Sequence, residues 1–526
     1  MAVNVADLAG TVQGPTKRFT SGDVEIALIP AALMPYIDDG RVQQADPVES
    51  GALLFLSGAL GVAMPDANWG DRLRIDGGGQ PGATAVVDYN FGKYQLVLLP
   101  GVTLTHAGAP MHEQNPAKPD DDAAYAVCTF NLRGMGSGTD QYPLPAEYML
   151  QLRKRARVVA ERMTGCTVLA LQETGVPQDA EALARMLDEE FGLPYTALAL
   201  PGPQTSSTQF PLTNSVLIRR DRVDVLAATA EQGCSPVSYD VFDAPGACPI
   251  GEYGLFDRLP LVVDLNVRGA WGEPVRLRVI DNHWKSKSGD EAVNVPRRRG
   301  QAAFVAGLAQ AWLDQDPAGA VVVLGDLNDY LGSEPVETLR TGTEPDLEQA
   351  YDWLPRLARY SYIYDGASQA LDHILFSANL LDTLAAVNIV RVSADFAMPA
   401  VDDPESYLHT SDHDPVMVHF RPGGAAWLGG NLRYPGIMIE ARGPDATTVA
   451  ATATDANGDF RLWDLPAATT ITLTLTAPAA LTLPGEPMTL TLHPGINSYS
   501  ARPIHAAVQT GTAAILSTAR PGGGAP

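Results

Sequence analysis

Polar side chains of the kinds that bind cations and move protons stand beside apolar runs at six places in the middle of the chain. The clearest case is VVVLGDLNDY at 321–330, where four apolar residues and a glycine lead into Asp326, Asn328 and Asp329. A short apolar run bounded by glycine predicts a strand that is buried on both faces, so the acids would stand at the end of a rigid strand. The side chains at the six places are, in chain order, Asn131, Glu173, His283, Asp326 with Asn328, Asp372, and Asp412 with His413.

The oxygen-rich composition of this set predicts a hard cation. Carboxylate and amide oxygens are the ligands that Mg²⁺ prefers, and Mn²⁺ or Ca²⁺ would also fit. The histidines add groups that transfer protons near neutral pH, and a histidine beside a carboxylate has a fixed tautomer and a raised pKa. Together these groups can activate water, neutralise charge on a phosphoryl group and assist a leaving oxygen. A polar turn would explain any one of the six places, but six in one segment favour a common site at one edge of a sheet.

The segment that carries these side chains alternates predicted strands with predicted helices. Helices are expected over 145–163, with Pro145 at the start and Gly165 just after the end, and around 305–312, where apolar residues recur at helical spacing. Mixed strands and helices of this kind predict an α/β or α+β core with a layered sheet. Strands are expected at AYAVCTFNL, TVLALQET, NSVLIRR, VRLRVIDNHW, AVVVLGDLND, LDHILFS and VMVHF.

Composition divides the chain of 526 residues into several parts, because a chain of this length is too long for one core. Residues 1–110 hold short apolar runs broken by Gly, Pro and Asp, which predict an all-β domain. The polar, proline-bearing residues 111–122 predict a linker. Residues 123–422 would form the catalytic domain, 430–506 a β-sandwich of Thr, Ala and Leu strands, and 507–526 a flexible tail.

The charge of the chain excludes some classes of partner. A formal net charge of −25 and a pI near 4.6 argue against general electrostatic attachment to DNA or to anionic membranes, so a bound cation would have to attract a phosphate substrate. Lys285, Lys287 and the arginines at 297–299 are local basic groups that either clamp a polyanion or form a solvated surface. No apolar run reaches the roughly 20 residues of a membrane span, and the start of the chain shows no signal peptide.

Two of the four cysteines flank a loop. Cys234 and Cys248 enclose a segment with proline and glycine, and a disulfide that closed it would contribute about 3 kcal/mol in the chain-entropy model. Cys128 and Cys166 each lie at or just before an apolar run. Four reduced thiols stay the alternative to one or more bridges.

Six motifs in the middle of the chain occur in a specific order, namely TFNLRG, LALQET, NHWKSKSG, GDLND, LDHILFS and SDHDPV. This order resembles that of the endonuclease/exonuclease/phosphatase superfamily over residues 123–421, and most closely its secreted bacterial, deoxyribonuclease-like branch. The resemblance implies an α+β fold, built as a four-layer α/β/β/α sandwich, and metal-dependent hydrolysis of phosphodiester bonds. The substrate would be nucleic acid, DNA and also RNA, cut by an endonuclease with Mg²⁺ as cofactor.

The same resemblance implies a role for each polar position. Glu173 would bind the metal, with Asn131 beside it and Asp412 as a further ligand. The catalytic residues would be His283, which assists the leaving group, Asp326 and Asn328, which align water and phosphate, His413, which contacts the phosphate or moves a proton, and Asp372, which orients His413. The substrate-binding residues would be Lys285, Arg133 and Arg299. Arg133 stands where the family often has an Asp or Asn that helps to bind metal, which argues against a second metal position.

The flanking parts resemble accessory domains. GDRLRIDG and GKYQLVLLPGV are similar to the small β-barrel of oligonucleotide-binding type that precedes the nuclease domain in secreted relatives. DANGDFRLWDLPA is similar to transthyretin-like or carboxypeptidase-regulatory-like modules, which implies a structural role or contact with a cell surface or a polymer. This combination, together with the loop between Cys234 and Cys248, implies an extracellular or cell-surface location.

Other functions stay open. A sphingomyelinase-type phospholipase and an inositol-phosphate phosphatase share the core motifs, although NHWKSKSG favours a nuclease. DNH at 281–283 and GDLND at 325–329 match half of the calcineurin-like metallophosphoesterase motifs, but the later G-N-H-[DE] and G-H-x-H are missing. A non-catalytic surface binding protein would be expected to lose a metal carboxylate or the catalytic histidine, and this chain retains Glu173, Asp326 and His413.

Overall fold

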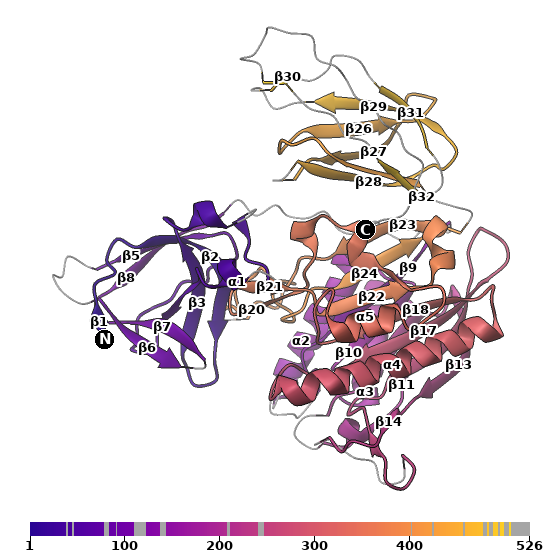
Figure 1. The fold of residues 1–526 in the computed structure, drawn as a ribbon, viewed down its shortest axis with the longest axis horizontal. Coiled ribbons are helices and arrows are strands. Elements are labelled where there is room, and N and C mark those ends of the chain that lie inside the picture. The colour runs from indigo at the N-terminus through magenta and orange to yellow at the C-terminus, as the bar shows by residue number, and fades with distance from the viewer. Residues whose placement is uncertain are drawn as a thin grey trace.

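The computed structural model describes the chain at residues 1–37, 40–44, 47–77, 84–90, 92–109, 123–136, 144–207, 211–239, 247–400, 402–422, 426–455, 458–476, 481–482, 488–492, 495–498 and 504–505. The strands and helices fall into three groups that follow one another along the chain (Figure 1). The residues expected to form the linker, 111–122, and the tail, 507–526, lie outside the described residues. Within the described residues, no helix is long and apolar enough to cross a membrane.

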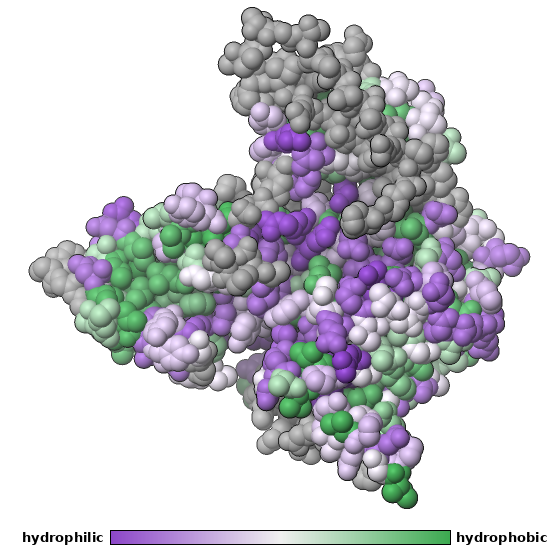
Figure 2. All heavy atoms as spheres, viewed as in Figure 1, coloured by the Kyte–Doolittle hydropathy of each residue, from purple (hydrophilic) through white to green (hydrophobic). Residues whose placement is uncertain are grey.

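The first group is an eight-stranded sheet with the strand order β1-β6-β7-β4-β3-β2-β5-β8. Its apolar core includes Val12, Ile26, Leu56 and Leu98. Figure 2 shows hydrophobic side chains gathered over this sheet and hydrophilic ones where it meets the rest of the chain. The elements are β1 (Ala2–Val3), β2 (Ala9–Arg18), β3 (Val24–Pro30), η1 (Met34–Tyr36), α1 (Pro47–Ser50), β4 (Leu54–Ser57), β5 (Arg72–Asp76), β6 (Ala85–Asn90), β7 (Lys93–Leu98) and β8 (Thr103–Ala107).

The second group contains two six-stranded sheets. The first sheet has the order β11 (Tyr195–Ala199), β12 (Ser215–Arg219), β10 (Val168–Gln172), β9 (Tyr125–Asn131), β24 (Val416–Phe420) and β23 (Leu384–Ile389). The second sheet has the order β13 (Val223–Ala230), β16 (Leu261–Val267), β17 (Val275–His283), β18 (Ala320–Asp326), β22 (Asp372–Phe376) and β19 (Glu348–Gln349). All seven strands expected in this segment are present, and the mixed α+β class is confirmed.

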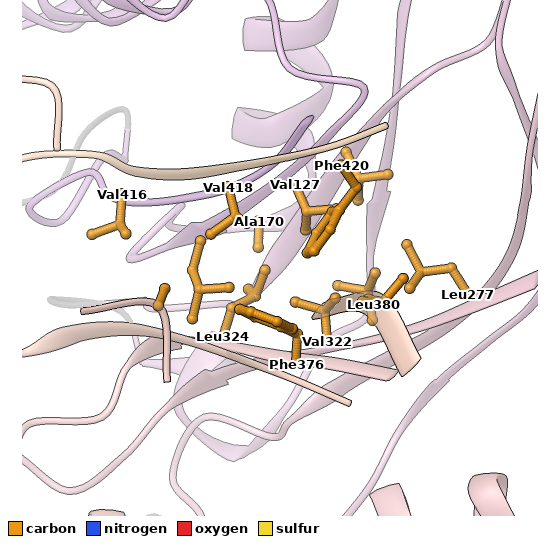
Figure 3. Close-up of a cluster of buried hydrophobic side chains, with 14 of the residues drawn as sticks. Val127, Ala170, Leu277, Val322, Leu324, Phe376, Leu380, Val416, Val418 and Phe420 are labelled. Carbon is orange, nitrogen blue, oxygen red and sulfur yellow. The ribbon is translucent and has the colours of Figure 1, made fainter. Parts of the chain in front are cut away.

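The apolar core of the second group lies between these two sheets (Figure 3). Val127 and Val418 of the first sheet and Val322 and Phe376 of the second sheet are all buried in it, and the rings of Phe376 and Phe420 meet edge to face with centroids 5.4 Å apart. Successive residues of a strand point to opposite faces. The alternate residues of the same strands therefore face outwards and need a second cover.

Helices provide this cover on the outer face of each sheet. On the first sheet, α2 (Pro145–Arg157), the π-helical turn η3 (Val158–Arg162) and α3 (Pro177–Phe191) bury residues such as Leu152 and Leu187. On the second sheet, α4 (Glu291–Gln315) and α5 (Glu334–Arg340) bury residues such as Val305 and Leu339. The packing forms four layers in the order helix, sheet, sheet and helix. The helices expected over 145–163 and around 305–312 are both present.

Two disulfides lie in the second group. The predicted bridge between Cys234 and Cys248 is present. A further bridge joins Cys128 of β9 to Cys166, just before β10. In the parallel register of β9 and β10, Cys128 lies opposite Leu169, three residues beyond Cys166. No local signal in the sequence indicates this second pairing. The short elements of this group are η4 (Pro203–Ser206), β14 (Cys234–Ser235), β15 (Tyr253–Gly254), η5 (Ala350–Trp353), η6 (Arg356–Ala358), β20 (Tyr362–Tyr364), β21 (Ala367–Gln369) and η7 (Ala378–Thr383).

The third group contains a three-stranded and a four-stranded sheet, with a core that includes Leu428, Ile439 and Phe460, and the two-stranded sheet β30-β33. It is joined to the end of β24 by an ion pair in which Arg421 Nε donates to Asp464 Oδ1 at 2.6 Å. The strands are β25 (Ala426–Asn431), β26 (Met438–Arg442), β27 (Thr448–Ala453), β28 (Asp459–Leu465), β29 (Thr470–Thr476), β30 (Leu481–Thr482), β31 (Met488–Thr491), β32 (Gly495–Ser498) and β33 (Ile504–His505).

The eight-stranded sheet meets the second group at a buried ion pair. Arg41 is 4% exposed and donates to both carboxylate oxygens of Asp395, at 3.0 and 3.1 Å. Its guanidinium lies between the rings of Trp69 and Tyr360, 3.6 and 4.1 Å from their centroids. Arg41 therefore fixes the two groups against each other through charge and through stacking.

Replacing Arg41 with methionine is expected to lower the free energy of unfolding by about 3–5 kcal/mol, because the largely buried Asp395 would lose its guanidinium partner. The measurement is urea-induced unfolding of the full chain, followed by tryptophan fluorescence. Arg74→Met is the matched control, since Arg74 pairs with Asp7 at the exposed surface, where such pairs contribute less than about 1 kcal/mol. Equal losses in the two variants would contradict the prediction.

Candidate active site

The candidate site lies where the core between the two sheets ends. Asn131 of β9 and Asp326 of β18 each stand an even number of residues after core residues of the same strand, so their side chains lie on the core face. His283 reaches the same edge on β17, which runs parallel to β18 and pairs His283 with Asp326. Asp372 begins the antiparallel strand β22 directly opposite Asp326. Strand alternation alone thus brings four of the expected site residues to one edge.

Gly325 allows β17 and β18 to approach closely enough for this arrangement. Its φ is +126°, and a Cβ at this position would lie 2.0 Å from the carbonyl oxygen of Asn282. No side chain fits at that distance. The glycine in VVVLGDLNDY is therefore required by the strand contact that sets His283 beside Asp326.

Glu173 reaches the site through a turn. Gln172 is the last residue of β10, and its Nε2 donates to Asp281 Oδ1 at 2.6 Å. Glu173 then has a φ of +60°, which residues with a side chain rarely adopt, and its carbonyl oxygen accepts from the backbone N of Met135 at 2.8 Å. The turn brings Glu173 Oε1 to 3.4 Å from Asn131 Nδ2, which donates to it.

Three side chains converge on Oδ2 of Asp326. Asn131 Nδ2 donates to this oxygen at 3.0 Å, and His283 Nε2 and His413 Nε2 lie 3.6 and 4.0 Å from it. His283 Nε2 also lies 3.8 Å from Glu173 Oε1. The side chain of Glu173 is 21% exposed whereas the others are buried, so a ligand would reach the group from the side of Glu173.

A buried carboxylate holds His413. The ring donates from Nδ1 to Asp372 Oδ2 at 2.7 Å, and Ser361 Oγ donates to the same oxygen at 2.6 Å. The ring of Tyr362 lies against the imidazole, with centroids 4.6 Å apart. These contacts place a proton on Nδ1 and direct Nε2 towards Asp326, so Asp372 is a positioning residue for His413.

The two histidines have pKa values shifted in opposite directions. Burial, with the positive charges of Arg258 and His413, lowers the pKa of His283 well below its usual value. Burial also acts to lower the pKa of His413, but the carboxylates of Asp372 and Asp326 outweigh it and raise that pKa well above its usual value. Near neutral pH, His283 is therefore neutral and His413 carries a positive charge.

Two carboxyl groups of the site have raised pKa values. Burial raises the pKa of Asp326 to about 7, although the positive charge of His413 opposes this shift. Burial and the negative charge of Asp412 raise the pKa of Glu173. A cation between these carboxylates would stabilise their charged forms.

The donor set fits a hard divalent cation. Glu173 Oε1 and Asp326 Oδ2 both accept from Asn131 Nδ2, and carboxylate oxygens of this kind suit Mg²⁺, Mn²⁺ or Ca²⁺. Asp412, the third ligand expected from the sequence, is half-exposed, and its Oδ2 lies 3.9 Å from Arg133 Nε. Glu173 and Asp412 therefore offer carboxylates at the accessible side of the site.

A second grouping of donors is geometrically compact. Ligand atoms of Asp326, Asp372 and His413 lie within 4.8 Å of one another. Asp372 and His413 are already hydrogen-bonded to each other. This grouping therefore fits a pair that handles a proton better than it fits a metal site.

The expected substrate-binding residues differ in their placement. Arg133 lies beside Asp412 at the accessible side of the site. Lys285 Nζ donates to Ser286 Oγ at 3.0 Å and to Ser288 O at 3.1 Å, so its charge is directed into its own loop. Arg299 pairs with Glu334 on the exposed side of α4, and the structure does not bring it to the other site residues.

Asn328 and Arg258 hold neighbouring parts of the site in place through hydrogen bonds. Asn328 has its backbone N donating to Asp326 Oδ1 at 2.9 Å and its Nδ2 donating to Trp284 O at 3.3 Å, so this expected catalytic residue shapes the turn. Arg258 is buried and donates to the carbonyl oxygens of His283 and Trp284. Sequence reasoning missed Arg258, because GLFDRLP has neither strand periodicity nor a motif.

One segment of the chain matches the model of a known protein family. Residues 262–421 match the model of the Endonuclease/Exonuclease/phosphatase family. The matched segment contains His283, Asp326, Asp372 and His413, whereas Asn131 precedes it. No curated protein sequence matches the chain.

Three solved structures show what the chain is similar to. Humanized D. rerio TDP2 carrying 14 mutations is 15% identical, and the match covers 57% of this chain and 99% of that one with a TM-score of 0.38. The endonuclease/exonuclease/phosphatase from Bacteroides vulgatus is 15% identical, with 56% and 98% covered and a TM-score of 0.39. The human Nocturnin catalytic domain with a bound sulfate anion is 15% identical, with 58% and 96% covered and a TM-score of 0.37. A likeness at this level carries no information on the substrate.

Proposed function

We propose that the chain is a metal-dependent phosphodiesterase that cleaves nucleic acid as an endonuclease, with DNA as the main substrate and RNA as a further one. The observation that carries the proposal is the convergence of Asn131, His283 and His413 on one oxygen of Asp326, next to the carboxylate of Glu173. The match of residues 262–421 to a phosphodiesterase-containing family supports the same class of reaction.

Asp326 is the base that accepts a proton from the attacking water. Its pKa of about 7 lets it change its protonation state near neutral pH, which is the condition for efficient proton transfer. Asn131 Nδ2 fixes Oδ2 and the backbone N of Asn328 fixes Oδ1. The carboxylate is therefore held in one orientation.

The two histidines act on different groups of the substrate, His413 on the phosphoryl oxygens and His283 on the leaving oxygen. His413 is cationic and directs Nε2 to the space beside Asp326, where it stabilises negative charge on the phosphoryl oxygens. His283 is neutral, and its Nδ1 is buried without a hydrogen-bond partner, which favours a proton on Nε2. From Nε2 it donates a hydrogen bond to the leaving oxygen.

Glu173, Asn131 and Asp412 would hold the divalent cation at the accessible side of the site. The bound cation would supply positive charge to the substrate phosphate. The need for it follows from the chain itself, because a net charge of −25 repels a polyanion.

Incubation of the full chain with supercoiled plasmid and Mg²⁺ is expected to give nicked circles. Excess EDTA is expected to lower the rate by at least about 100-fold, because charge neutralisation by the metal would be lost. Added Mg²⁺ should restore the rate, which controls for damage by the chelator. Nicking that is insensitive to the chelator would contradict the metal dependence.

Single-stranded RNA and sphingomyelin, assayed in parallel, test the substrate class. Cleavage of sphingomyelin without cleavage of nucleic acid would keep the site and replace the substrate with a phospholipid. No turnover of any of the three would favour a small-molecule phosphatase, such as an inositol-phosphate phosphatase, or a non-catalytic binding protein.

We place this activity outside the cell or at its surface. All four cysteines are paired, and such bridges persist in oxidising compartments. The third group, in this proposal, contacts a cell surface or a polymer. Recovery of the activity in the lysate instead of the culture medium would contradict the location.

A further inference from the structure

A cavity of about 230 Å³ lies between the eight-stranded sheet and the candidate active site. Lys17 and Phe19 line it from the side of β2, and Tyr362 and Asp412 line it from the second group. Tyr362 is the residue whose ring lies against His413. The cavity therefore adjoins the atoms that would act on a phosphodiester, and both groups of the chain form its walls.

Backbone contacts hold β2 in its place as a wall of the cavity. A Cβ on Gly14 would lie 3.2 Å from the Cα of Gly366, so the two backbones touch at this point. The backbone N of Met398 donates to Thr16 O at 2.9 Å, and Arg18 Nε donates to Met398 O at 3.1 Å. These contacts flank Lys17 on both sides. Lys17 therefore lies beside the site without any movement of the eight-stranded sheet relative to the second group.

Within the described residues, the Nζ of Lys17 makes no hydrogen bond and no direct ion pair, and it lies 5.0 Å from the ring centroid of Tyr364. Burial lowers the pKa of this ammonium group, and the negative charges of Asp365, Glu25 and Asp412 act against that shift. Glu25 and Asp365 already accept from Lys93 Nζ at 2.8 and 2.7 Å. Lys17 is thus available to an anionic group that enters the cavity.

The lining holds apolar and aromatic side chains next to the acids Glu25, Asp365 and Asp412. Phe19, Phe396, Met398 and Ile363 contribute apolar surface, and the side chain of Phe19 is 44% exposed. Aromatic side chains bind nucleobases by stacking, whatever the sequence of the strand. A cation beside an aromatic wall is the combination that binds a phosphate together with its base.

We propose that this cavity is a subsite for the nucleotide next to the scissile phosphodiester, with Lys17 contacting its phosphate and Phe19 and Phe396 packing against its base. The inference rests on the proposed function, because it takes a nucleic acid as the ligand. It adds to that function a role for the eight-stranded sheet. Arg18 and Arg133 also line the cavity, but each lies beside an acid, Asp66 and Asp412 respectively, whereas Lys17 has no direct ion pair with a described residue. In a chain with a net charge of −25, such a cation has a large effect on where a polyanion binds.

The test is the equilibrium binding of a fluorescein-labelled hexathymidylate with phosphorothioate linkages to the full chain, measured by fluorescence anisotropy in Mg²⁺, because these linkages slow hydrolysis while the cation stays bound. Lys17→Met is expected to raise Kd about tenfold, which corresponds to the loss of one charge-assisted contact. The slope of log Kd against log salt concentration is expected to fall by about 0.7, the value for one phosphate contact on a single strand. A merely structural role of Lys17 would not change this slope.

Two further variants control the result. Arg74→Met removes a charge from the same sheet at a site where Arg74 pairs with Asp7 outside the cavity, and it should leave Kd within about twofold. Lys17→Arg keeps the charge and should bind nearly as well as the wild type. An unchanged Kd in Lys17→Met, equal losses in Lys17→Met and Arg74→Met, or no binding by the wild type would overturn the subsite.

The binding assay and the plasmid assay separate the two proposals. Nicking of plasmid with binding that does not depend on Lys17 would overturn the subsite and keep the phosphodiesterase. Binding that depends on Lys17 without any hydrolysis would overturn the phosphodiesterase and keep the subsite.

Discussion

Replacing His413 with alanine is expected to lower kcat on a phosphodiester substrate by about 10²–10⁴-fold, the usual range for a group that transfers a proton or stabilises charge at the reacting phosphate. The imidazole is held by Asp372 through Nδ1 and by the ring of Tyr362, so its Nε2 has one direction. Its raised pKa keeps it positive near neutral pH. Alanine would remove both the charge and the hydrogen-bond donor from the site.

The measurement is the initial rate of plasmid nicking at saturating Mg²⁺. His106→Ala is the matched control, because His106 forms a hydrogen bond of the same kind with Asp71, at 2.6 Å, in the eight-stranded sheet. We expect this control to retain nearly the wild-type rate. A loss of less than about tenfold in His413→Ala, in a variant that unfolds like the wild type, would show that His413 does not take part in the chemical step.

Replacing Asp326 with asparagine is expected to lower kcat by at least about 10²-fold, because this residue is the proposed base and its Oδ2 is the shared contact of the site. Asparagine has nearly the same shape, so the hydrogen bonds from Asn131 and from the backbone N of Asn328 can be retained in part. The expected defect is therefore chemical and not structural.

The pH profile of kcat/KM separates a chemical defect from a structural one. In the wild type, kcat/KM is expected to rise with pH as Asp326 loses its proton, at a pH of about 7 or below because a bound cation stabilises the carboxylate, and this rise should vanish in Asp326→Asn. Asp264→Asn is the control, since Asp264 is a carboxylate of the same sheet that pairs with Arg278 at 2.7 Å outside the site. An Asp326→Asn variant with the wild-type rate and pH profile would remove Asp326 from the mechanism.

Much of the core could be predicted because its strands are continuous apolar runs. β9 and β18 are buried along their whole length. Strands buried on both faces are mostly apolar and stand out in the sequence as continuous apolar runs. β13 is mostly exposed and lies at the edge of the second sheet. The sequence VDVLAATA shows no regular alternation of apolar and polar residues, so it does not predict this strand.

The candidate site was predictable where it depends on strand ends. Asn131, His283 and Asp326 could be grouped because each stands at the end of an apolar run. Contacts between distant segments leave no such local signal. Arg258 supports His283 from an irregular segment, and Lys17 reaches the site from another sheet. The roles of all these residues stay predictions.

The pairing of β9 with β24 sets the order in which this molecule becomes complete during synthesis. These are the first and the last strands of the two six-stranded sheets, and they lie side by side with Val127 opposite Val418. β9 leaves the ribosome long before β24, so the first sheet stays open at its middle until nearly the whole second group has been made. His413 emerges only just before β24. A nascent chain that ends between Asp326 and His413 therefore carries Glu173, His283 and Asp326 without His413, and a cell that makes this protein is exposed to an assembled site only after β24 has been made.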